Sequence, residues 1–263
     1  MHIEHIVVGQ LPAVRISAPD GALATVTLYG AHLVSWVGAD GAERMFMSKR
    51  SALDGSRALR GGVPVIFPQF SEQGSGMRHG FARVSNWRLA GDGVENGAAW
   101  AEFALDQGDL APAHGAAWPH RFALALRITL QGNELTMDLS VRNCGDAPFP
   151  FAAALHTYHL VPQLAEVRID GVEAGTLTIC DKLDKVYSGI DGTVTLATSA
   201  RVLVLEQEGF SDAVVWNPGA ADTAALADMQ DDEYQRFVCI EPAQLQAVTL
   251  APATGWRGHY RIR

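Results

Sequence analysis

The sequence predicts an all-β protein, built as a large antiparallel β-sandwich with a few short helices. Three observations support this. Short segments rich in β-branched and aromatic residues recur along the chain, glycine, proline and asparagine separate them, and helix signals are few. Many short strands with frequent turns are typical of sandwiches, whereas strands alternating with helices would indicate a parallel sheet. The chain shows no repeat or long linker, so residues 1–263 are expected to form a single domain.

The clearest element is a hairpin between residues 124 and 141. Two runs with an apolar residue at every second position flank the short loop Gln131-Gly132-Asn133. This alternation turns one face of each strand towards a core, and a loop containing glycine and asparagine suits the reversal of the backbone. The apolar positions are Leu124, Leu126, Ile128, Leu130, Leu135, Met137, Leu139 and Val141.

The other expected elements are shorter. Gly30-Ala31 indicates a bulge or tight corner between two strands, and Asp222 could cap a short alanine-rich helix that runs to residue 229. Strands are predicted, in chain order, at 13–17, 23–29, 32–37, 99–105, 149–158, 166–169, 176–180, 200–205, 213–216, 237–241, 247–250 and 256–262.

Composition and charge exclude several classes of protein. Hydrophobic residues make up 48% and charged residues 19%, as in ordinary soluble proteins. The net charge of −9 argues against nucleic acid as a partner. No apolar run reaches the roughly 18 residues of a membrane span, and the first residues lack the features of a secretion signal. Three widely spaced cysteines fit no disulfide framework, which favours the cytoplasm. We expect a monomer.

The stretch from Arg57 to Arg83 is the first candidate site. It gathers four arginines and His79 among glycines and prolines in an acidic protein. Guanidinium groups suit carboxylate or phosphate oxygens, and Gly61-Gly62 would allow a ligand or backbone to approach closely. The simpler alternative is a turn with solvated arginines. The four arginines are Arg57, Arg60, Arg78 and Arg83.

Two histidines at 156 and 159 raise the question of a metal. On a strand, residues three apart face opposite sides, so His156 and His159 could not share one ion, and no third ligand with suitable spacing stands out. No metal site is therefore predicted. His156 could act alone, or it could be a buried histidine with a hydrogen-bonded ring.

Glu241 lies between Ile240 and Pro242, an unusual place for a solvated charge. Pro242 is expected to end the strand and to fix where the carboxylate points. A carboxylate with a histidine elsewhere is the minimum needed for moving protons, although a glutamate paired with arginine is the alternative.

Three more polar or aromatic residues follow apolar strands. Asp181 and Asn217 could bind sugar hydroxyls, and Trp216 could stack on a pyranose face. Asn-Pro-Gly is more often simply a turn.

Together these motifs resemble the hexose-6-phosphate mutarotases (glucose-6-phosphate 1-epimerases) of the aldose 1-epimerase superfamily. The landmarks occur in the family's order and extend over most of the chain. They are Asp54-Gly55-Ser56, Leu59-Arg60-Gly61-Gly62-Val63-Pro64-Val65-Ile66-Phe67-Pro68, His79-Gly80-Phe81-Ala82-Arg83, Leu155-His156-Thr157-Tyr158, Cys180-Asp181-Lys182-Leu183, Val214-Val215-Trp216-Asn217-Pro218 and Cys239-Ile240-Glu241-Pro242.

The resemblance implies an antiparallel β-sandwich that interconverts the α and β anomers of a phosphorylated hexose without a cofactor. By position, His156 matches the family's general acid and Glu241 its general base. The two groups are expected on opposite sides of one sugar ring, with one removing the proton from the C1 hydroxyl while the other protonates the ring oxygen. Alternatives are a sugar-binding protein without activity, a neutral aldose epimerase, or a glycoside hydrolase using Asp181 and Glu241.

The resemblance also implies residues that bind the substrate. Arg60, Arg83 and Asp181 match substrate-binding positions, and His79 stands where the superfamily has a histidine near the sugar ring. Arg78 stands where such relatives often have glutamine before His-Gly, and this difference could add a phosphate contact or shift the substrate preference.

Overall fold

Three antiparallel sheets make up the protein. The structure is a computed structural model that describes residues 2–74 and 76–263. The first sheet is a four-stranded meander in sequence order. Its strands are β1 (Ile3–Val8), β2 (Leu11–Ser17), β3 (Leu23–Thr27) and β4 (His32–Val37).

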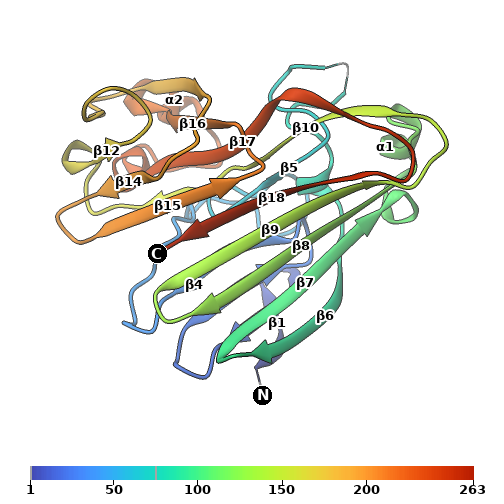
Figure 1. Cartoon of the computed structure of the whole chain (residues 1–263). Coiled ribbons are helices and arrows are strands. Elements are labelled where there is room, and N and C mark those ends of the chain that lie inside the picture. The colour runs from blue at the N-terminus through green and yellow to red at the C-terminus, as the bar shows by residue number, and fades with distance from the viewer. Residues whose placement is uncertain (1, 75) are drawn as a thin grey trace.

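The largest sheet has eight strands and crosses the front of the molecule (Figure 1). It contains the predicted hairpin, which is confirmed. Gln131 pairs with Glu134 around a two-residue turn in which Gly132 has a φ of 62°. The strand order is β12 (Arg168–Asp170), β14 (Val194–Ala197), β15 (Val202–Glu208), β18 (Gly255–Ile262), β9 (Glu134–Asn143), β8 (Phe122–Gln131), β7 (Ala98–Asp106) and β6 (Arg88–Glu95).

The third sheet has six strands and lies behind and above the eight-stranded sheet in Figure 1. Its order is β13 (Leu183–Ser188), β16 (Asp212–Asn217), β17 (Phe237–Leu250), β10 (Phe149–Leu155) and β5 (Val65–Ile66), with β11 (Tyr158–Leu160) also paired to β17. The two prolines at 64 and 68 bracket β5, which is only two residues long, as expected for residues that interrupt strands.

Helices are short and lie at the edges of the sheets. Figure 1 shows α1 (Pro112–Ala117) and α2 (Gly219–Ala225) at opposite sides of the molecule. Single 3₁₀ turns are η1 (Ala82–Val84), η2 (Gln107–Asp109), η3 (Leu164–Glu166) and η4 (Glu233–Arg236). In the described residues, no helix is long and apolar enough to cross a membrane.

The main hydrophobic core contains side chains from all three sheets. The eight alternating apolar residues of the β8–β9 hairpin are at most 1% exposed and face this core. Val14 and Trp36 enter it from the four-stranded sheet, and Val238 and Ile240 enter it from β17. The predicted all-β antiparallel sandwich is therefore confirmed.

Several local predictions are wrong. Residues 176–180 form no strand and make only one isolated bridge, between Leu177 and Ile169. Asp222 does not cap a helix, because α2 begins at Gly219 and its N-terminal cap is Pro218. The predicted strand at 149–158 is interrupted at His156 and Thr157.

Pro242 does not end its strand either. It pairs with Ala213, and β17 continues to Leu250. The last pair of β17 with β10 is Ala154 with Ala243, so the missing N–H of Pro242 faces the break after β10, where little is lost.

Candidate active site

The register of the six-stranded sheet brings His156 and Glu241 together. Two cross-strand pairs flank these residues at equal spacing, so His156 and Glu241 lie directly opposite each other. The flanking pairs are Ala154 with Ala243 and Tyr158 with Cys239.

Glu241 faces away from the sandwich core because side chains alternate along β17. Val238 and Ile240 point into the main core, whereas Cys239 packs in a separate cluster with Tyr158 on the opposite face. Glu241 shares that opposite face, two residues along from Cys239. A glutamate can therefore occupy a central strand without entering the apolar core.

The imidazole and the carboxyl group are in direct contact. His156 Nδ1 lies 3.2 Å from Glu241 Oε1, and the two side chains are only 11% and 1% exposed. Among the described residues, neither His156 Nδ1 nor Glu241 Oε2 has a hydrogen-bond partner. Buried polar atoms nearly always have partners, so these atoms are suited to a ligand.

Burial shifts both groups of this pair towards their neutral forms. It raises the pKa of Glu241 well above its ordinary value, and the nearby Asp184 raises it further. It lowers the pKa of His156 well below 6.5, and His79, Arg60 and Arg83 lower it further. The acid proton of the pair is therefore favoured on the carboxyl group, beside a neutral imidazole.

Arg60 is fixed by two neighbours. Its Nε donates to Asp228 Oδ1 over 3.2 Å, and its Nη1 donates to Tyr158 Oη over 3.1 Å. Tyr158 also stacks on the His156 ring, with the ring centroids 4.9 Å apart and the planes at 9°. Arg60 is thereby held beside the histidine.

Arg83 lacks such a partner. Its guanidinium donates to the backbone carbonyl of Arg78 over 2.9 Å, and its buried Nε has no hydrogen-bond partner among the described residues. Burial lowers the pKa of Arg83 to about 10. A half-buried guanidinium with a buried Nε and no carboxylate is costly unless an anion joins it.

His79 is a neutral donor. Burial and the nearby Arg83 lower its pKa to about 3. The Ser71 N–H donates to His79 Nδ1 over 3.2 Å, so the proton of the neutral ring is on Nε2. The backbone holds this ring with a φ of 62°, and the ring lies edge-on to His156 with the centroids 5.9 Å apart.

These side chains line one cavity of about 390 Å³. Seven of the nine site residues predicted from the sequence line it: Arg60, Arg78, His79, Arg83, His156, Trp216 and, at the floor, Glu241. Arg57, the remaining arginine of the predicted arginine-rich stretch, also lines the cavity. The sequence analysis assigned no role to five other lining residues, because nothing in their local pattern distinguishes them: Phe70, Ser71, Tyr158, Asp184 and Asp228.

A family model described as aldose 1-epimerase matches residues 12–263. The chain belongs to the aldose 1-epimerase family. A protein of Cenchrus ciliaris named "Putative glucose-6-phosphate 1-epimerase" is 32% identical over 96% of this chain and 84% of its own length. A protein of Escherichia coli K12 with the same name is 31% identical over 84% of this chain and 79% of its own.

Solved structures share the fold of this aldose 1-epimerase family member. The crystal structure of the mutarotase-type protein YeaD from Salmonella typhimurium has a TM-score of 0.88 at 26% identity, covering 99% of this chain and 92% of that one. Galactose 1-epimerase from Lactobacillus acidophilus has a TM-score of 0.71 at 14% identity, covering 99% and 97%, which shows the likeness of fold alone.

Two expected site residues do not line the cavity of this family member. Asp181 is exposed, and its Oδ1 accepts a hydrogen bond from the N–H of Ala220 in the first turn of α2. Asp184, the direct cross-strand partner of Trp216, lines the cavity instead. Asn217 is fully buried.

Asn217 holds the chain reversal after β16. Its amide donates to the carbonyls of Tyr234 and Phe237 over 2.8 and 2.9 Å, and its Oδ1 accepts from Gly219 N–H. We expect Asn217→Ala to lower the free energy of unfolding by about 2–4 kcal/mol, because it leaves buried groups unpaired. Asp181→Ala, at an exposed cap, should cost only about 1 kcal/mol. Urea denaturation of both variants measures this, and equal losses would contradict it.

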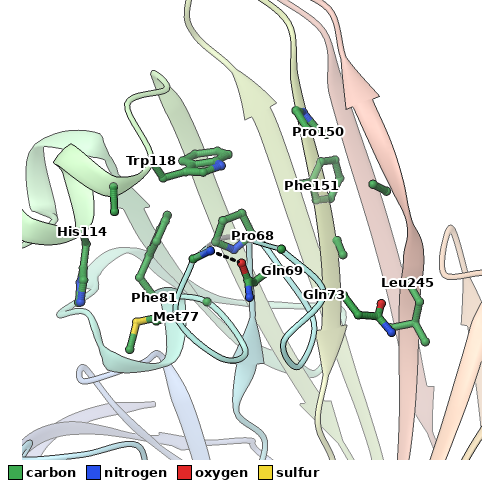
Figure 2. A pocket seen from close by; sticks show the side chains of 16 residues that line it. Pro68, Gln69, Gln73, Met77, Phe81, His114, Trp118, Pro150, Phe151 and Leu245 are labelled. Carbon is green, nitrogen blue, oxygen red and sulfur yellow. Dashed lines mark hydrogen bonds between the residues drawn. The ribbon is translucent and has the colours of Figure 1, made fainter.

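A second, apolar pocket of about 260 Å³ is lined in part by Pro68, Gln69 and Gly80 (Figure 2). Figure 2 shows Phe81, Trp118 and Phe151 around it, with Gln69 on the loop side. Gln69 Oε1 accepts from Gly76 N–H over 2.8 Å. The described lining residues include no Asp, Glu, Lys or Arg, so this pocket offers no anion site.

Proposed function

We propose that this protein interconverts the α and β anomers of a hexose 6-phosphate, with glucose 6-phosphate as the expected substrate. The observation that carries the proposal is the His156–Glu241 contact at the floor of a cavity with four arginines in its wall. The names of the two relatives above, which cover most of this chain, support the same substrate.

In the proposed reaction, Glu241 takes the proton from the C1 hydroxyl and His156 gives a proton to the ring oxygen. These two oxygens are bonded to the same carbon, so the acid and the base must lie side by side. The 3.2 Å contact fits that requirement better than the expected placement on opposite sides of the ring. The C1–ring-oxygen bond breaks, C1 turns, and the reverse transfers close the ring on its other face.

The phosphate would also prepare the acid. For His156 to donate, the proton of the pair must first move from Glu241 to the imidazole. The fields of Arg60 and Arg83 oppose this, since both lower the pKa of His156. A phosphate dianion beside these guanidinium groups would offset their charge and raise that pKa. Binding of the remote phosphate thereby favours the active proton arrangement.

The remaining cavity residues would orient the sugar. We assign the phosphate to Arg83 and Arg60, with the exposed Arg78 at the cavity mouth as a weaker contact. Nε2–H of His79 would donate to a ring oxygen or hydroxyl, and the carboxylate of Asp184 would accept from a hydroxyl. Trp216 stands edge-on to His156, with the centroids 5.8 Å apart, where its ring can pack on the pyranose.

The alternatives make different demands on the cavity. A neutral aldose epimerase would leave the half-buried Arg83 guanidinium without an anion. A glycoside hydrolase would need a second carboxylate across the bond, and Asp181 does not line the cavity. A binding protein without activity would not require the His156–Glu241 pair.

Exchange NMR of α and β anomers tests the proposal directly. With the protein present, exchange of glucose 6-phosphate should be faster than that of glucose at equal concentration. The KM for the phosphorylated sugar should rise with salt, whereas that for glucose should hardly change. Binding of glucose 6-phosphate without faster exchange would instead support the sugar-binding alternative.

We also propose that the protein works as a monomeric single domain in the cytoplasm. One chain supplies every residue of the cavity wall, and the main core joins all three sheets. Sugar phosphates are charged and remain inside cells. A single cooperative unfolding transition, independent of protein concentration, would support this.

A further inference from the structure

Three side chains that can bind a metal ion meet at the floor of the cavity. They are His156, Cys239 and Glu241, and their ligand atoms all lie within 4.8 Å of one another. His156 and His159 cannot share an ion, because His159 is buried on the other side of the sheet, where its Nε2 lies 3.3 Å from Tyr260 Oη. The strand pairing instead supplies two ligands from β17.

Two of these three atoms already lie about as close together as neighbouring ligands of a tetrahedral ion. Zn²⁺ binds sulfur at about 2.3 Å and nitrogen or oxygen at about 2.0–2.2 Å, so neighbouring ligands lie roughly 3.3–3.6 Å apart. His156 Nδ1 and Glu241 Oε1 are already 3.2 Å apart. Small rotations of the Cys239 and Glu241 side chains would bring the sulfur into range. Thiolate and imidazole favour Zn²⁺ over Mg²⁺ or Ca²⁺.

Two further observations point to a ligand at this place. His156 Nδ1 and Glu241 Oε2 are buried polar atoms without a hydrogen-bond partner among the described residues. Both residues also line the open cavity, which gives an ion a path to them, while Cys239 lies fully buried just beneath. Three protein ligands with a fourth position towards the cavity is the arrangement of catalytic rather than structural zinc sites.

The charges also balance. Arg60 and Arg83 line the same cavity and oppose any added positive charge there. Binding of a divalent ion would release the protons of Cys239 and Glu241. The resulting complex of ion, thiolate and carboxylate is neutral, as the protonated side chains are. The arginines therefore meet no added net charge.

We propose that His156, Cys239 and Glu241 form an inhibitory site for a thiophilic divalent ion such as Zn²⁺, which competes with the sugar. Coordination uses the lone pairs of His156 and Glu241 that would otherwise exchange protons with the substrate. The inhibition rests on the proposed function, whereas the binding of the ion does not. Cys239 serves only the ion, which separates the two activities.

Cobalt(II) is the probe, because it reports its own ligands. We use the Cys144→Ser/Cys180→Ser double variant, which removes both exposed thiols and leaves Cys239 as the one cysteine of the sequence. One Co²⁺ per chain should bind with a sulfur-to-cobalt charge-transfer band and the intense visible bands of a four-coordinate ion. Affinity should rise with pH, since protons leave on binding.

Cys239→Ala and Cys239→Val in the same background are the matched variants. Each should lose the sulfur band and weaken Co²⁺ binding by more than about 100-fold, since even loss of an outer-shell partner costs 10–100-fold. Zn²⁺ should slow anomer exchange in the double variant but not in these two, whose exchange without metal should be unchanged. Should both Cys239 variants fail to fold, His156→Gln and Glu241→Gln must each weaken Co²⁺ binding.

Two results would overturn the proposal: no sulfur band in the double variant, or equal Co²⁺ affinity with and without the Cys239 thiol. Glucose 6-phosphate should displace Co²⁺ if both proposals hold. A sulfur band with no anomer exchange on any sugar would support the metal site while removing the proposed function, so the two failures are distinguishable.

Discussion

Glu241→Gln is expected to slow anomer exchange of glucose 6-phosphate by about 10²–10⁴-fold, the range typical of a positioned acid or base. Glutamine keeps the shape of the side chain but cannot accept the proton of the C1 hydroxyl. Because substrate contacts remain, the loss should fall on kcat rather than on KM. Exchange NMR at saturating substrate measures this.

Stability gives an independent reading of the same substitution. The pKa of Glu241 is raised on folding. The contribution of the neutral side chain to the free energy of unfolding is therefore fully present below pH 4.5, the ordinary pKa, and is lost as the pH rises through the pKa of the folded state. Glutamine does not titrate. The variant should therefore gain stability relative to the parent as pH rises above 4.5, as denaturation across pH would show.

Glu208→Gln is the control, because Glu208 lies exposed at the end of β15. It should leave the exchange rate of glucose 6-phosphate unchanged. Wild-type turnover in Glu241→Gln would remove the assigned role of the carboxylate. A rate loss accompanied by unfolding would instead show that Glu241 is only structural.

The fold can be predicted from local sequence patterns, whereas the site depends on pairing between strands that are distant in sequence. The β8–β9 hairpin follows from period-two alternation and a glycine turn, both of which are readable within a few residues. The contact of His156 with Glu241 depends on the register between strands that are far apart in sequence. No local signal fixes that register, and the two residues were matched only through a family resemblance.

The differences between the sequence expectations and the structure at Asp181, Pro242 and Asn217 also come from long-range pairing. Asp181 and Asp184 are both acidic residues near the start of one strand, and only the alternation of β13 beside Trp216 decides that Asp184 reaches the cavity. Pro242 is expected to end its strand, because proline lacks the N–H that a strand interior needs. This expectation is wrong here because the neighbouring strand is itself broken where the N–H is missing. The side-chain amide of Asn217 could bind a sugar hydroxyl, but it already makes hydrogen bonds to three backbone groups.

Arg83→Met is expected to raise the KM for glucose 6-phosphate by about 10–150-fold, because a hydrogen bond to a charged group contributes about 1.5–3 kcal/mol. Anomer exchange of unphosphorylated glucose should change little, since no charge on that sugar needs the guanidinium. Arg57→Met, which removes an exposed arginine of the same cavity wall, is the matched control and should shift KM by far less.

Thermal or urea unfolding with ligand separates a phosphate site from a structural arginine. At 100 times its Kd, glucose 6-phosphate should raise the free energy of unfolding of the parent by about 2.7 kcal/mol. If Arg83→Met weakens binding 100-fold, the same concentration should give only about 0.4 kcal/mol. Without ligand, methionine should be tolerated, because Arg83 makes no ion pair among the described residues. An equal ligand effect in both proteins would mean that the phosphate binds elsewhere, and the half-buried guanidinium would then need another anion.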